Sequence, residues 1–225
     1  AERLSEAAAI HESFLREGKQ VIGDHEFHQQ RRHDLIAIYS KQDRTDDANR
    51  LHRAVLEAEE RHEGSGASRL LASRSALWLG RRAAREFAAV RLEAPLEDSL
   101  ARKRDAMKVA IDYYQQAESF GFPETATEST YRLAEMYRRL AQDVIDSERP
   151  EGLTDLQADQ YEMLLEEEAY PFEEKAIELH QRNQKRIARG HWSRWISRSL
   201  GRLAEMFPAR YDRETRWMEA RNEQR

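Results

Sequence analysis

The stretch that decides the fold runs from Ala110 to Tyr137 and reads AIDYYQQAESFGFPETATESTYRLAEMY. Both of its ends carry alanine, leucine and tyrosine at the three- and four-residue spacing of one helix face. Between them lies Gly121-Phe122-Pro123, with a glycine where a helix ends and a proline just beyond it. The stretch therefore predicts two helices joined by a short link, which pack against each other as an antiparallel hairpin.

Similar breaks divide the rest of the chain into further helices. Asp46 and Thr154 are expected to cap helices, and Pro171 is expected to begin one after a break at Tyr170. The segment 64–68, Gly-Ser-Gly-Ala-Ser, is the best internal boundary. Helices are predicted over 1–19, 23–41, 46–63, 68–92, 96–120, 124–147, 154–169, 171–190 and 191–207. The expected regions are N-terminal hairpins over 1–63, a repeat region over 67–209 and a polar tail over 210–225.

Composition agrees with an all-α fold. The 225 residues are rich in the helix formers Ala, Glu, Arg and Leu, and contain only 9 glycines and 5 prolines. The absence of cysteine excludes disulfides and thiolate metal sites. A net charge of −5 does not suggest a general nucleic-acid binder, and no run approaches the ~20 apolar residues of a membrane span.

Several groups of residues resemble tetratricopeptide (TPR) units, which are helix hairpins of ~34 residues with small and large side chains at fixed offsets. They are Leu35, Ile36, Tyr39 and Ala48; Ala110, Tyr114, Ala117 and Pro123; Leu133, Ala134 and Tyr137; and Ala176 and His180. The resemblance implies antiparallel hairpins stacked as a right-handed solenoid. The long gaps from Ser68 to Ala110 and from Tyr137 to Ala176 indicate lengthened helices or an inserted helix.

Three further stretches, 131–137, 147–150 and 170–177, are similar to bacterial TPR proteins of the cell envelope. That resemblance implies a scaffold of an envelope complex, with a periplasmic location favoured and a cytoplasmic one left open. The chain begins at Ala1-Glu2 without a methionine, which suggests a processed protein or an excised fragment.

A solenoid presents a concave surface lined by the first helix of each hairpin. The arginines and one tyrosine expected there are partner-binding candidates, because arginine holds carboxylates through two hydrogen bonds. These residues are Arg81, Arg82, Arg85, Tyr131, Arg132, Arg138 and Arg139. Trp192 and Trp195, three apart on one expected helix face, form either a docking patch or part of the core.

The histidines are the only residues whose spacing raises the question of a metal site. His25 and His28 share a helix face near His33, but no third ligand is fixed by spacing, so exposed histidines are the preferred interpretation. Glu59 and His62 form a Glu-x-x-His pair, whereas di-iron bundles need two such pairs. No nucleotide-binding or nucleophile motif is present. The sequence therefore predicts no cofactor, no metal and no enzymatic activity.

Charge is distributed unevenly along the second half. Acidic residues dominate 140–178 and basic residues dominate 179–217. These charges either pair across neighbouring helices or form a charged groove that steers a partner. We expect a protein–protein interaction scaffold. The alternatives are an oligomerising helical bundle, with the chain as a homo-oligomer, and an RNA-binding helical repeat.

Overall fold

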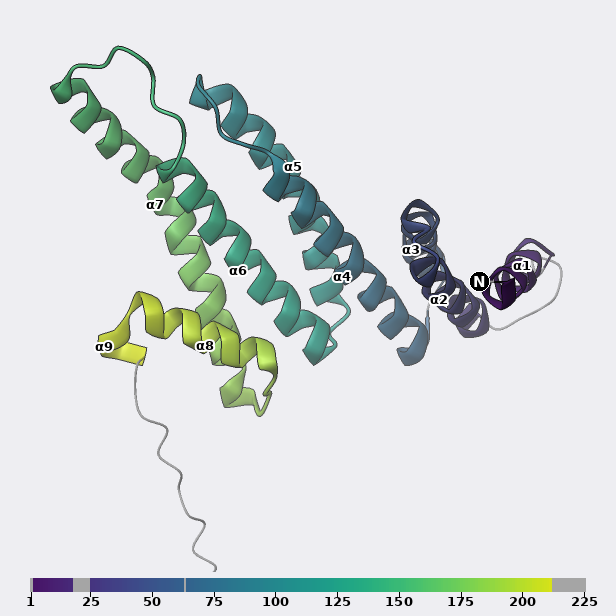
Figure 1. Ribbon diagram of the computed structural model, residues 1–225. Coiled ribbons are helices and arrows are strands. Elements are labelled where there is room, and N and C mark those ends of the chain that lie inside the picture. Colours follow the sequence, from purple (N-terminus) through teal and green to yellow (C-terminus); the bar gives the residue numbers. More distant parts are fainter. Residues whose placement is uncertain (1, 18–24, 63, 212–225) are drawn as a thin grey trace, which may run out of the picture.

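A computed structural model describes residues 2–17, 25–62 and 64–211 of the chain (Figure 1). These residues contain helices and no strand, which confirms the all-α prediction. The helices are α1 (Glu2–Glu17), α2 (His25–Lys41), α3 (Thr45–Arg61), α4 (Gly66–Ala89), α5 (Leu96–Ser119), α6 (Pro123–Ile145), α7 (Asp155–Lys185), a 3-10 turn (Ile187–Arg189), α8 (Arg194–Met206) and α9 (Pro208–Tyr211).

The expected helix stops explain most of the boundaries. Gly121, with a φ of +81°, ends α5, and Pro123 is the first residue of α6. Thr154 caps α7 through a reciprocal pair of hydrogen bonds with Gln157, as the sequence predicts. The side chains of Ser65 and Ser193 cap α4 and α8, each by accepting one hydrogen bond from a backbone N–H of the first turn.

Two boundary predictions are wrong. Pro171 lies inside α7, which continues unbroken for 31 residues, because Leu165 and Ala169 before it and Ala176 after it are all buried in the core. Pro171 itself is exposed, so water can solvate the carbonyl group that loses its helical partner. Asp46 lies in the first turn of α3 and does not cap it; the residue before the helix is Arg44, whose side chain makes no capping bond.

Each helix from α1 to α8 packs against the next along the chain, and alternate helices also contact one another. The additional contacts join α2 to α4, α4 to α6, and α6 to α8. The even-numbered helices therefore form one row, and α3, α5 and α7 pack behind it. This row places side chains from four distant segments on one surface.

The main core lies between α4, α5, α6 and α7 and extends to Ile36 of α2 and to Val55 and Leu56 of α3. Ala110, Tyr114 and Ala117 of α5 and Ala134 of α6, which are residues of the repeat-like pattern, are fully buried there. Gly80 of α4 lets α5 approach closely, because a Cβ atom at this position would lie 2.7 Å from the ring of Tyr114. The small residues of the pattern are thus sites of close helix contact.

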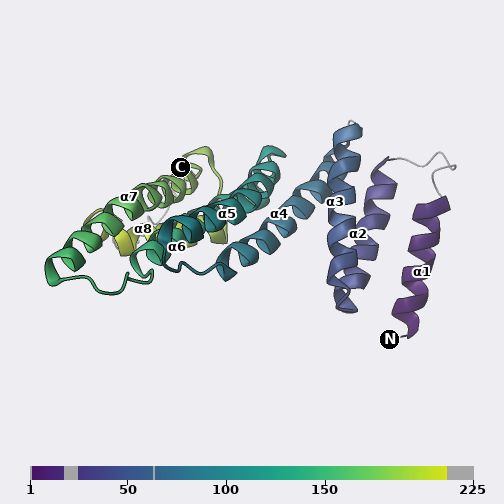
Figure 2. The same ribbon diagram turned by 90° about the horizontal axis from the view of Figure 1, so that it is seen from above.

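The N-terminal helices form a smaller assembly at one end of the molecule (Figure 2). A separate cluster of Ala8, Leu35, Tyr39 and Ala48 holds α1, α2 and α3 together. The helix α4 begins within the segment 64–68, at Gly66. Residues 212–225 of the predicted tail lie outside the described residues. No helix in the described part of the chain is long and apolar enough to cross a membrane.

Candidate functional site

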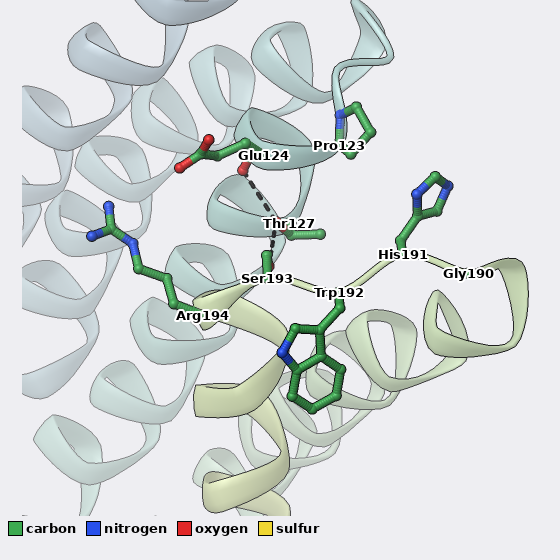
Figure 3. Close-up of a pocket in the computed structure, with 8 residues that line it drawn as sticks. All are labelled: Pro123, Glu124, Thr127, Gly190, His191, Trp192, Ser193 and Arg194. Carbon is green, nitrogen blue, oxygen red and sulfur yellow. Dashed lines mark hydrogen bonds between the residues drawn. The ribbon is translucent and has the colours of Figure 1, made fainter. Parts of the chain in front are cut away.

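Two adjoining hollows lie on the surface of the even-numbered row, and we call them together the groove. The first has a volume of about 400 Å³ and is lined by residues of α2, α3, α4, α6 and α8 and by Phe122. The second, about 570 Å³, lies between the start of α6 and the segment 190–194 (Figure 3). Glu124 and Arg194 line both hollows, so the groove is continuous across α6.

The groove is anchored by a buried carboxylate. Glu128 of α6 is 2% exposed and accepts hydrogen bonds from Arg81 Nε at 2.8 Å and Arg132 Nε at 2.5 Å. Burial beside this cluster raises the pKa of Tyr114 to about 12. Arg81, a predicted binding residue, therefore joins α4 to α6, whereas Arg132, another predicted residue, pairs with Glu128 within α6.

Three other predicted arginines also have acidic partners. Arg82 lies 3.4 Å from Asp46, Arg138 lies 3.5 Å from Glu135, and Arg139 lies 3.6 Å from Asp143. Only Arg85 among the predicted arginines is exposed and without an ion pair to the described residues.

The structure identifies three arginines that the sequence prediction missed. Arg74 of α4 and Arg194 of α8 line the groove, and Arg198 follows one turn after Arg194; all three are exposed and none pairs with a carboxylate of the described residues. On α4, residues 74, 78, 81 and 85 share one helix face. That spacing is visible in the sequence and would have placed Arg74 beside the predicted Arg81 and Arg85.

The tryptophans differ from the prediction that they share a helix face. Trp195 is 4% exposed in α8 and packs against Tyr131 with ring centroids 5.4 Å apart, so core packing is the correct alternative for this residue. The guanidinium carbons of Arg132, Arg194 and Arg198 lie 4.8–5.1 Å from the Trp195 ring.

Trp192 precedes α8, is 65% exposed and lines the second hollow (Figure 3). The segment that carries it is fixed to α6, since the hydroxyl of Ser193 donates to Thr127 at 2.9 Å.

A chain of hydrogen-bonded polar groups lies at the end of the groove formed by α2, α3 and α4. His33 Nε2 donates to the carbonyl of Leu71 at 2.9 Å and lies 3.1 Å from the hydroxyl of Ser75, which is 3.0 Å from His52 Nδ1. Burial, followed by the nearby His33, lowers the pKa of His52 to about 3. The His52 ring stacks on Trp78 at 4.3 Å, and its Nε2 atom has no hydrogen-bond partner among the described residues.

One buried cluster resembles a catalytic triad in connectivity. Ser199 Oγ lies 3.2 Å from His180 Nδ1, and His180 Nε2 lies 3.4 Å from Glu135. Ser199 is fully buried and also accepts a hydrogen bond from Asn183 at 3.0 Å. The Ser199 hydroxyl is therefore enclosed between α7 and α8, where it holds the two helices together.

The histidines near the N-terminus do not converge. His25 Nε2 lies 2.8 Å from Glu59, and its ring lies 5.1 Å from that of His62, whereas His28 packs against Phe14. Among the described residues no group of three metal-ligating side chains comes together.

The basic segment pairs mainly with helices other than the acidic segment. Arg182 and Arg186 contact Glu118 of α5, and Arg202 contacts Glu135 of α6. Pairing across neighbouring helices therefore accounts for these three arginines, and it leaves many carboxylates of α7 exposed.

The groove is open at the surface of the molecule. Its exposed charges are Arg74, Arg194 and Glu124, its exposed apolar surface includes Trp192, and its buried polar groups hold neighbouring helices together. No known protein family, curated protein or solved structure matches the chain.

Proposed function

We propose that the chain is a non-enzymatic scaffold that binds other proteins through the groove, and that its hairpins form a TPR-like right-handed solenoid. Alternate-helix contacts support this proposal, since helical repeats stack so that one helix of each hairpin builds a continuous surface. The location in a bacterial envelope complex is proposed from the sequence resemblance alone.

The observation that carries the proposal is the set of arginines without ion-pair partners beside exposed tryptophan. Arg74, Arg85, Arg194 and Arg198 lie along the even-numbered row, and only Glu124 opposes them as an exposed carboxylate in the groove. Arginine and tryptophan are the residues that dominate protein–protein binding energies. The groove is therefore suited to an acidic protein segment that also carries a large apolar side chain.

The spacing of charges favours protein over RNA as the ligand. Glu124 lies where the two hollows meet, so a polyanion with a phosphate at every nucleotide would meet a carboxylate there. A peptide can place a neutral residue at that point and acidic residues on either side.

Selection from a displayed library of random peptides tests the proposal. We expect enrichment of acidic peptides that contain large apolar residues. Their binding should be lost in the double variant Arg74→Glu/Arg194→Glu and kept in Arg50→Glu, which changes an exposed arginine of α3. Enriched peptides that bind the double variant equally well, or displacement of every peptide by single-stranded RNA at low concentration, would contradict the proposal.

A further inference from the structure

The N-terminal half of α7 carries an exposed apolar stripe. Leu156, Met163 and Tyr170 follow one another at intervals of seven residues and are 68%, 62% and 58% exposed, with Leu164 beside them at 60%. Residues seven apart lie on the same face of a helix. Contiguous large apolar side chains of this kind mark interaction surfaces in soluble proteins.

Carboxylates without ion-pair partners flank this stripe. Asp159, Glu166, Glu167 and Glu173 are exposed and make no ion pair to the described residues, and Glu166 and Glu167 form a shallow hollow with Met163 and Tyr170. We call this surface, from Leu156 to Glu173, the α7 face. An anionic lipid surface would repel it, and so would a second α7 face laid upon it, because both arrangements bring like charges together.

The groove has the opposite chemistry. Arg74 and Arg194 line it without an ion-pair partner among the described residues, and Arg85 and Arg198 extend the same faces of α4 and α8 beyond it. Trp192 is exposed there and Trp78 is partly exposed. Along α4, Arg74 and Arg85 are separated by about 16 Å, and along α7 the stripe from Leu156 to Tyr170 covers about 21 Å, at 1.5 Å per helical residue. The two surfaces thus match in charge, in apolar content and in length.

We propose that the groove of one copy of this chain binds the α7 face of a second copy. This inference rests on the proposed function, and it names the partner of the groove. The two surfaces lie on different parts of the same molecule: the groove is next to the start of α6, whereas the α7 face belongs to the half of α7 that follows the end of α6. The contact is heterologous, so each bound copy presents a free groove at one end and a free α7 face at the other.

Analytical ultracentrifugation of the full chain tests the inference. One variant, Arg74→Glu/Arg194→Glu, blocks the groove, and a second, Glu166→Arg/Glu167→Arg, blocks the α7 face. We expect the unchanged chain to form species larger than dimers as concentration rises, and to dissociate at high salt. Each variant alone should remain monomeric. An equimolar mixture of the two should form a dimer and nothing larger, since only one groove and one α7 face per pair remain intact.

Circular dichroism and thermal melting confirm first that both variants are folded, and Arg50→Glu/Arg53→Glu on α3 serves as a matched charge-reversal control that should still self-associate. A chain that stays monomeric at all concentrations would overturn the inference. Self-association that survives either reversal, or a mixture that fails to dimerise, would overturn it as well.

The failure of this inference is distinguishable from failure of the proposed function. The Glu166→Arg/Glu167→Arg variant keeps its groove, so peptide selection can be repeated on it. Selected acidic peptides that bind this variant while the unchanged chain remains monomeric would leave the scaffold function standing with a different partner.

Discussion

The N-terminal helices and the rest of the molecule differ in helix length and in the size of the apolar core. The helices α1 to α3 have 16 or 17 residues each and share a small apolar cluster. The helices α4 to α7 have 23 to 31 residues and enclose the main core. Longer helices bury more apolar surface per hairpin, so we expect the second region to set the global stability and the first to open at lower free energy.

The junction between the two regions differs from the interior of either. It combines apolar packing of Ile36, Val55 and Leu56 in the main core cluster with polar contacts, in which His33 and His52 share the hydroxyl of Ser75 on α4. Polar contacts fix orientation at a modest net gain in stability. The groove begins at this junction and continues over α6 and α8, so the stronger region carries most of the groove.

The largest expected effect comes from a buried charge in the stronger region. Lys103 is 1% exposed, with Nζ 2.9 Å from Asp143 and 3.3 Å from the carbonyl of Phe87. The side chain of Asp143 is 27% exposed and also lies 3.6 Å from Arg139, so the main cost comes from the backbone carbonyls of Phe87 and Val90 that lose the ammonium group, at about 1–3 kcal/mol for each unsatisfied buried group. We expect Lys103→Met to lower the free energy of unfolding by about 3 kcal/mol in urea melts. Lys108→Met, at an exposed position of the same helix, should change it little. Equal effects of the two changes would refute the structural role of Lys103.

Replacement of buried alanines by leucine should produce the next largest loss in the free energy of unfolding. Ala110 and Ala117 are fully buried in α5, and Ala101 is exposed in the same helix. We expect Ala110→Leu and Ala117→Leu to cost about 1–3 kcal/mol each, and Ala101→Leu only a few tenths. Ala8→Leu in α1 should speed hydrogen exchange in α1 but hardly move the main transition. A large shift of that transition by Ala8→Leu would mean that the two regions unfold as one.

Acidification should loosen the junction before it unfolds the stronger region. Because burial lowers the pKa of His52 to about 3, only the unfolded state gains a proton at this site as pH falls below about 6.5. The free energy of unfolding should therefore decrease between about pH 6.5 and pH 3, with a slope from this residue of at most about 1.4 kcal/mol per pH unit. His52→Gln should flatten the pH dependence, whereas His191→Gln, at an exposed position, should leave it unchanged. Identical slopes in all three proteins would exclude His52 as the cause.

Replacement of glycine by alanine should have the smallest effect on stability, and the sign of the effect should differ between two positions. A Cβ atom at Gly80 would meet the Tyr114 ring at 2.7 Å, whereas none of the surrounding atoms lies within 4 Å of a Cβ at Gly201. We expect Gly80→Ala to destabilise the protein, since the clash outweighs the better helix propensity of alanine. Gly201→Ala should stabilise it by about 0.5–1 kcal/mol. Thermal melts of the two variants measure both signs, and a stabilised Gly80→Ala protein would show that α4 and α5 have room to separate.

Sequence patterns predicted the helices well and the surface poorly. Gly121, Pro123 and Thr154 determine helix ends through local backbone chemistry, which a sequence displays directly. Pro171 was misplaced because tertiary burial on both sides of it overrides its local preference. The predicted arginines lie on the even-numbered row, and several of their ion pairs follow helical spacing that the sequence displays: Arg132 with Glu128, Arg138 with Glu135 and Arg139 with Asp143. The pairing of Arg81 with the buried Glu128 joins α4 to α6, and no local pattern shows it.

Hydrogen exchange with a peptide that copies residues 155–174 tests most directly whether the groove is the binding surface. This peptide carries the acidic and apolar residues of the α7 face. We expect a saturating amount to slow amide exchange in α4 around residues 74–85 and at the starts of α6 and α8, and to leave α1 unchanged. Exchange that slows on α3 and α5, behind the row, or a pattern that is unchanged by Arg74→Glu/Arg194→Glu, would contradict binding in the groove.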